Sequence, residues 1–130
     1  MSSTSPTPYE ALGGEAGVQA LATAFYNAMD RLPEAQDIRR MHGASLDLIK
    51  AKLAAYLSGW LGGPLVYVER FGPMCLGHAH EPYEIGSAER DQWMLCMDTA
   101  LEEIGAPVPL REPLHKAFHR LASALRTVED

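Results

Sequence analysis

The sequence lacks several features that would assign it to a large functional class. Its 130 residues contain no apolar run near the roughly 20 residues that cross a bilayer, so we expect no membrane partner. Residues 1–8 have neither a basic start nor an apolar core, which excludes a signal peptide and favours a cytoplasmic location. The net charge is −6 and no basic cluster is present, so nucleic acid is excluded as a partner.

Cysteine is scarce, and its placement excludes several metal and redox motifs. Cys75 and Cys96 form neither CxxC nor CxxCH, which argues against a zinc ribbon, a thioredoxin-type site and covalent haem attachment. In a cytosolic protein we expect both thiols to be reduced. The phosphate-binding patterns GxxxxGK[ST] and GxGxxG are absent, as is the GxSxG pattern of serine hydrolases.

What the sequence does contain is a series of helical patterns separated by glycine and proline. Residues 15–32 repeat apolar side chains every three or four positions, as an amphipathic helix does. The same spacing predicts a short helix over 34–41 and longer helices over 45–61, 87–104 and 111–127, the last with Val128 facing inward.

The stretch between the third and fourth of these patterns, residues 64–77, is rich in proline and glycine, and we predict a loop there. No strand pattern finds a partner, so the predicted fold class is all-α. The predicted organisation is a disordered tail over 1–8 and one domain over 9–130.

Two histidines, His78 and His80, stand close together at the end of the predicted loop. A neutral imidazole on a short constrained element can bind a transition metal. The residues alone leave two other interpretations open. One is a non-haem metal site completed by Cys75 or His42, and the other is a regulatory helical domain without haem in which the histidines are incidental.

Aromatic residues at helical spacing are ambiguous in the same way. Tyr26 and Trp93 are either core residues or hydrogen-bond donors aimed at a ligand. His115 and His119 lie one helical turn apart, but they lack a third ligand and are interpreted as surface residues.

Taken together, these residues resemble the group II truncated haemoglobins, from about Tyr9 to Leu125. The family has two glycine motifs, a distal-tyrosine segment, a proximal-histidine segment and a segment with a hallmark tryptophan. The matching stretches here are Gly13-Gly14, Gly62-Gly63-Pro64, Ala24-Phe25-Tyr26, His80-Glu81-Pro82-Tyr83 and Glu89-Arg90-Asp91-Gln92-Trp93. The resemblance implies a two-over-two helical sandwich around a haem b (iron protoporphyrin IX).

The resemblance also implies roles for single residues. His80 would be the proximal ligand of the haem iron, while Tyr26, Trp93 and His42 would donate hydrogen bonds to a distal ligand. Apolar bulk would come from the distal helix, and the haem propionates would meet Tyr67 and Arg70. The complete expected pocket is Phe25, Ile49, Leu53, Tyr67, Arg70, Phe71 and Met97.

A haem with one histidine ligand leaves the sixth iron position open to O₂, NO or CO. Several distal donors would slow O₂ release, which suits scavenging, redox chemistry or sensing better than bulk oxygen transport. At the enzyme level the resemblance leaves haem peroxidase and NO dioxygenase activities open, with a reductase as partner. It is compatible with a monomer or a homodimer.

Overall fold

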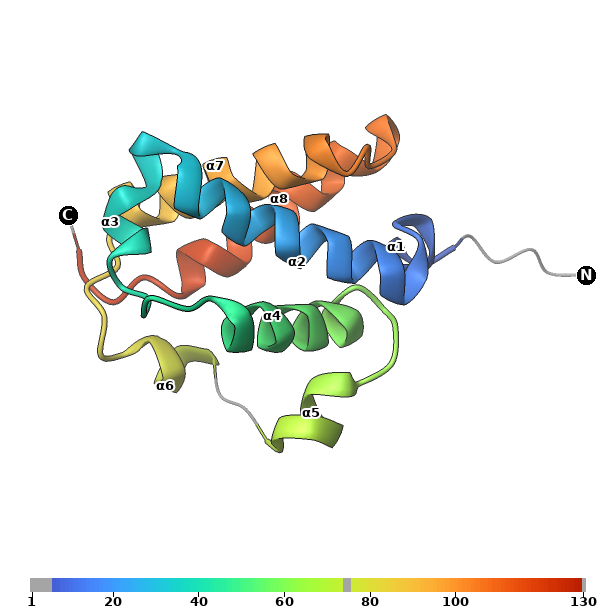
Figure 1. Ribbon diagram of the computed structural model, residues 1–130, viewed down its shortest axis with the longest axis horizontal. Helices are drawn as coiled ribbons and strands as arrows, with labels where there is room; N and C mark the ends of the chain where they lie inside the picture. The colour runs from blue at the N-terminus through green and yellow to red at the C-terminus, as the bar shows by residue number, and fades with distance from the viewer. Residues whose placement is uncertain (1–5, 74–75, 130) are drawn as a thin grey trace, which may run out of the picture.

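The computed structural model describes residues 6–73 and 76–129, with the backbone but not the side chain of His78. Within these residues every regular element is a helix, which confirms the predicted all-α class (Figure 1). The elements are α1 (Pro8–Ala11), α2 (Gly14–Arg31), the 3₁₀ turn η1 (Pro33–Ala35), α3 (Gln36–Arg39), α4 (Asp47–Trp60), α5 (Val66–Phe71), α6 (Leu76–His80), α7 (Ser87–Glu103) and α8 (Val108–Ala124). No helix in this part of the chain combines the length and apolar character needed to cross a bilayer.

The long helices form two pairs in contact. Helix α2 packs against α4 and α7, and α7 also packs against α8 (Figure 1). This is the two-over-two arrangement that the resemblance implies. The core between the pairs contains the side chains least exposed to solvent: Val18, Leu21, Phe25, Met29, Leu57, Cys96, Met97, Leu101 and Phe118.

The prediction of a loop over residues 64–77 is wrong. This stretch contains α5 and the start of α6, and Gly72 and Pro73 lie between these two helices. Both helices are too short to show a helical period in the sequence. The residues 74–75 between them lie outside the described part of the chain. Both short helices lie below α4 in Figure 1, and α5 packs against α4.

Other predicted boundaries also differ from the structure. Helix α1 begins at Pro8, inside the segment predicted as a tail, because the Thr7 hydroxyl accepts a hydrogen bond from the Glu10 N–H. Helix α8 begins at Val108, three residues earlier than predicted, since Pro109 is tolerated in a first turn. Its pattern ends at Ala124, so Val128 is 41% exposed and not inward-facing.

The two glycine motifs meet at α1. The Tyr9 N–H donates to the Leu61 carbonyl at 2.9 Å, and the Tyr9 ring covers Gly63 so closely that an added Cβ would lie 2.5 Å from it. Gly13, with φ of 105°, turns the chain from α1 into α2. The motifs therefore fasten the start of α2 to the end of α4.

Candidate functional site

His80 is the last residue of α6 and lies half-buried. Its Nδ1 lies 2.7 Å from the carbonyl oxygen of Leu76, one helical turn earlier. A carbonyl can only accept, so Nδ1 carries the proton. The neutral ring therefore has a bare Nε2, the form in which histidine binds a metal.

Tyr26 lies in the middle of α2 and is 5% exposed. No described residue forms a hydrogen bond with its hydroxyl, although its ring contacts Phe25 at 4.8 Å between centroids. Burial raises the pKa of Tyr26, so the hydroxyl stays protonated at neutral pH. No buried polar side-chain atom among the described residues lacks a partner, so the hydroxyl of this buried residue opens onto free space, with a hydrogen bond still to donate.

Trp93 is half-buried on α7, and its ring is tilted against Phe25 and Phe118, with centroid distances of 5.1 and 5.8 Å. Its indole N–H, like the Tyr26 hydroxyl, finds no hydrogen-bond acceptor among the described residues. The Phe25 ring therefore contacts the rings of both candidate donors, Tyr26 and Trp93.

His42 follows α3, and its ring lies edge-on to the Tyr26 ring at 5.7 Å. Its Nδ1 lies 2.8 Å from the Ile38 carbonyl oxygen, so the proton of the neutral ring again sits on Nδ1. The bare Nε2 of this form accepts a hydrogen bond and cannot donate one. The neutral His42 is therefore an acceptor beside Tyr26, in place of the third donor expected from the sequence.

Four apolar residues of the expected pocket come from the helices α2, α4 and α7. Phe25 and Met97 are fully buried on α2 and α7. Ile49 and Leu53 lie one turn apart on α4, half-buried and packed against the core. Their partial exposure leaves apolar surface on α4 that a flat apolar group can cover.

Helix α5 carries three residues of the expected pocket, and they do not lie together. Tyr67 and Phe71 contact each other at 5.1 Å between ring centroids, and the Lys52 Nζ of α4 lies 5.7 Å from the Phe71 ring. Arg70 is exposed and lines a separate depression between α2, α4 and α5, together with Glu15. Lys52, which the sequence did not single out, is thus a basic group beside the Tyr67–Phe71 pair.

The non-haem metal interpretation finds no support in the described residues. No group of three or more His, Cys, Asp or Glu side chains there could hold a metal ion. Cys75 and the side chain of His78 lie outside the described part of the chain. His115 is exposed and pairs with Asp98 at 2.9 Å, as expected for a surface residue.

Sequence reasoning missed the residues that hold these side chains in place. Arg39 bonds to the turn after His42, the Gln92 side chain bonds to the start of α3, and Thr127 bonds to the segment after His80. Gln92 and Thr127 lie more than 40 positions from their partners, and Arg39 is separated from Asp30 by a helix break. A local pattern in the sequence cannot report such contacts.

The arrangement fits a haem. His80 offers a metal-binding nitrogen, Ile49 and Leu53 offer apolar surface, and Tyr26 and Trp93 offer donors that no described residue uses. A haem held by one histidine would use these features: a nitrogen for the iron, apolar walls for the ring and polar groups for a ligand.

Comparison with known proteins agrees with this chemistry. Residues 7–127 match the family described as bacterial-like globin. The chain is 31% identical to the group 2 truncated hemoglobin YjbI of Bacillus subtilis (strain 168), with 92% of this chain and 85% of that protein covered.

Solved structures give the same result. The group II 2-on-2 hemoglobin of Agrobacterium tumefaciens is 45% identical, with a TM-score of 0.90 and 100% of both chains covered. The cold-adapted truncated hemoglobin of the Antarctic bacterium Pseudoalteromonas haloplanktis TAC125 is 41% identical, also with a TM-score of 0.90, over 95% of this chain and 99% of that chain. The chain therefore belongs to the bacterial-like globins, as a haem-binding group II truncated haemoglobin.

Proposed function

We propose that this globin binds haem b through His80 and uses Tyr26 and Trp93 to hold O₂, NO or CO. Haem supplies an iron atom on which a small diatomic molecule can bind. His80 orients the group through Nε2, because its Nδ1–H is fixed by the Leu76 carbonyl. Lys52 and Tyr67 are the proposed contacts for the propionates, given their positions around Phe71.

The observation that supports the proposal is the hydroxyl of Tyr26, a donor that no described residue uses although the residue is only 5% exposed. No buried polar side-chain atom among the described residues lacks a partner, so this hydroxyl opens onto space that a ligand can enter. The Trp93 N–H is a second donor that no described residue uses. O₂, NO and CO carry no hydrogen, so the bare Nε2 of His42 cannot bond to them, and the two donors orient and retain the ligand.

Slow release makes such a site unsuited to bulk oxygen transport. Each hydrogen bond to a charged partner contributes about 1.5–3 kcal/mol, and every 1.4 kcal/mol is about tenfold in affinity. The proposed role is accordingly scavenging, redox chemistry or sensing. If the role is redox chemistry, the proposed reactions are those of a haem peroxidase or an NO dioxygenase, with a reductase as the electron donor.

The test is the absorption spectrum of the protein expressed with haem. We expect an intense Soret band that shifts with CO in the parent. His80→Ala should lose most of the bound haem because the axial nitrogen is gone, while the matched control His78→Ala should retain it. A colourless folded parent would refute haem binding, and a normal spectrum in His80→Ala would move the ligand to another residue.

A further inference from the structure

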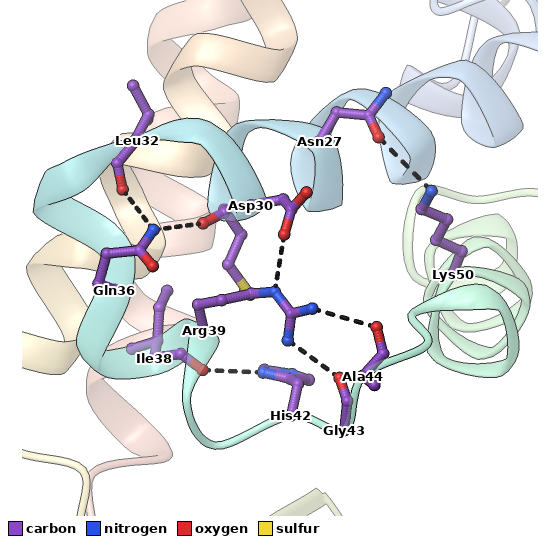
Figure 2. A network of polar contacts seen from close by, with 11 residues as sticks. Asn27, Asp30, Leu32, Gln36, Ile38, Arg39, His42, Gly43, Ala44 and Lys50 are labelled. Atoms are coloured by element: carbon purple, nitrogen blue, oxygen red, sulfur yellow. Dashed lines mark hydrogen bonds and ion pairs between the residues drawn. The ribbon is translucent and has the colours of Figure 1, made fainter.

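The turn that carries His42 is held by Arg39, the last residue of α3. The guanidinium donates to three oxygens: Asp30 Oδ1 through Nε at 3.0 Å, the Gly43 carbonyl at 3.0 Å and the Ala44 carbonyl at 3.2 Å. Figure 2 shows these contacts around one side chain. The Arg39 side chain is only 18% exposed, so the contacts are partly shielded from water.

These three contacts connect the two distal residues. Gly43 and Ala44 directly follow His42, whereas Asp30 lies on α2 one helical turn after Tyr26. Arg39 thus joins the turn that carries His42 to the helix that carries Tyr26. The His42 and Tyr26 rings lie 5.7 Å apart, so a shift of the turn changes this contact directly.

The start of α3 is fixed separately. The Gln92 side chain accepts from the Ile38 N–H at 3.3 Å and donates to Asp37 at 2.9 Å. The Gln36 side chain donates to the Leu32 carbonyl at 2.9 Å (Figure 2). With this end of the helix fixed, the Arg39 contacts decide the position of the turn that follows.

We propose that Arg39 is a positioning residue of the distal site, which keeps His42 in its Nδ1–H form and its Nε2 beside Tyr26. This inference rests on the proposed function. The Nδ1–H form requires the ring to stay 2.8 Å from the Ile38 carbonyl. When the turn is released, the ring leaves that carbonyl, the proton is free to sit on Nε2, and the acceptor becomes a donor.

An arginine is required because its planar group donates in several fixed directions at once, whereas the ammonium of lysine is a single point charge. Arg39→Lys should therefore behave like Arg39→Gln. The matched control is Arg40→Gln, which removes the same charge from the next residue. Arg40 is 70% exposed and pairs with Asp37 instead of the turn.

The experiment measures the His42 ring by ¹⁵N NMR in the CO-bound protein and the O₂ dissociation rate in parallel. In the parent and in Arg40→Gln we expect one Nδ1–H form and equal rates. In Arg39→Gln and Arg39→Lys we expect mixed forms and a rate changed by about tenfold, the size of one altered hydrogen bond. A purely structural role would lower stability in denaturant but leave the NMR form of His42 unchanged.

Asp30→Asn provides a second variant that keeps the side-chain shape, in case Arg39 variants do not fold. It should shift the His42 signals in the same direction as Arg39→Gln. Parent-like His42 signals in Asp30→Asn and in every folded Arg39 variant would overturn the proposal. Different results would refute the proposed function itself: a folded protein that binds no haem, or a Tyr26→Phe variant that releases O₂ at the parent rate.

Discussion

At the residue scale, the proposed distal site contains donors that no described residue uses. The Tyr26 ring contacts Phe25 and His42, and the Trp93 ring contacts Phe25. Unused donors contribute little to the stability of the fold and are available to a ligand. Stability and ligand release should therefore respond differently to their removal.

Tyr26→Phe deletes one oxygen and keeps the ring. We expect O₂ dissociation to become faster by about 5- to 150-fold, which corresponds to about 1–3 kcal/mol for one lost hydrogen bond. The free energy of unfolding of the haem-free protein should stay unchanged or rise, because the hydroxyl has no described partner to lose. Stopped-flow ligand displacement and urea titration measure the two quantities, and an unchanged rate would reduce Tyr26 to a core residue.

Cys96 gives a second prediction for a single residue. It is fully buried, and this burial raises the pKa of its thiol to about 11, only partly offset by the charge of Arg31. The unfolded thiol ionises near its ordinary pKa of 9.0, so the folded state holds its proton over the window from about pH 9 to 11. The stability that this thiol contributes is complete below pH 9 and is lost as the pH rises through the window.

The measurement compares the parent with Cys96→Ala, both in a Cys75→Ser background, by denaturant unfolding at pH 8 to 11. The free energy of unfolding of the parent should fall relative to the variant above pH 9, by at most about 1.4 kcal/mol per pH unit. Parallel curves would show that the thiol ionises equally in both states.

Some residues of the candidate site could be predicted from the sequence, and others could not. The segments around Tyr26, His80 and Trp93 could be recognised because their roles depend on short neighbouring stretches. The role of Arg39 could not, because its acceptors are two backbone carbonyls and a side chain on another helix. The tautomer of His42 depends in turn on a carbonyl position that only the fold supplies.

At the scale of elements, the segment after His80 is fixed by the end of the chain. The Thr127 N–H donates to the Ile85 carbonyl at 2.9 Å, and the Ile85 N–H donates to Thr127 Oγ1 at 2.8 Å. The Thr127 hydroxyl also donates to the Tyr83 carbonyl. This pairing, the Thr127 clasp, fixes the connection between α6 and α7 on the side of the proposed iron ligand.

Thr127→Val removes the hydroxyl but keeps the side-chain shape and the backbone bond. We expect haem to leave the protein several-fold faster, because the connection after His80 loses two of its three bonds to Thr127. Transfer of haem to an acceptor apoglobin measures this rate. Thr23→Val, at an exposed position of α2, is the control, and equal rates in both variants would contradict the role of the clasp.

Element length explains which helices the sequence could predict. Residues 14–31 and 87–103 contain enough turns for the apolar period to stand out, and both helices were predicted to within a residue or two. Helix α5 has six residues and α6 has five, less than two turns each. They lie in a stretch rich in glycine and proline, which the same rules assign to a loop.

At the scale of the whole molecule, packing is uneven. The helices α2, α4, α7 and α8 form one continuous core, whereas α6 has no extensive contact with another helix among the described residues. His80 thus lies on the least supported element of the fold. Binding of a group that contacts both α6 and α4 should tie this element to the core.

Amide hydrogen exchange tests this unevenness. Without haem, we expect amides of α6 to exchange much faster than those of α2 and α7, because local opening requires little loss of packing there. With haem, protection of α6 should rise more than protection of α2. Equal protection of both regions in the haem-free protein would show that α6 is held by contacts other than the cofactor.

The Thr127 clasp also sets an order of events during synthesis. His80 is added to the growing chain before Thr127, so for part of translation the proposed iron ligand exists without the residue that fixes its connection to α7. The nascent chain can form α2 and α4 during that interval. Firm capture of haem should therefore follow release of the segment around Thr127, even though every side chain proposed to touch the haem has been made earlier.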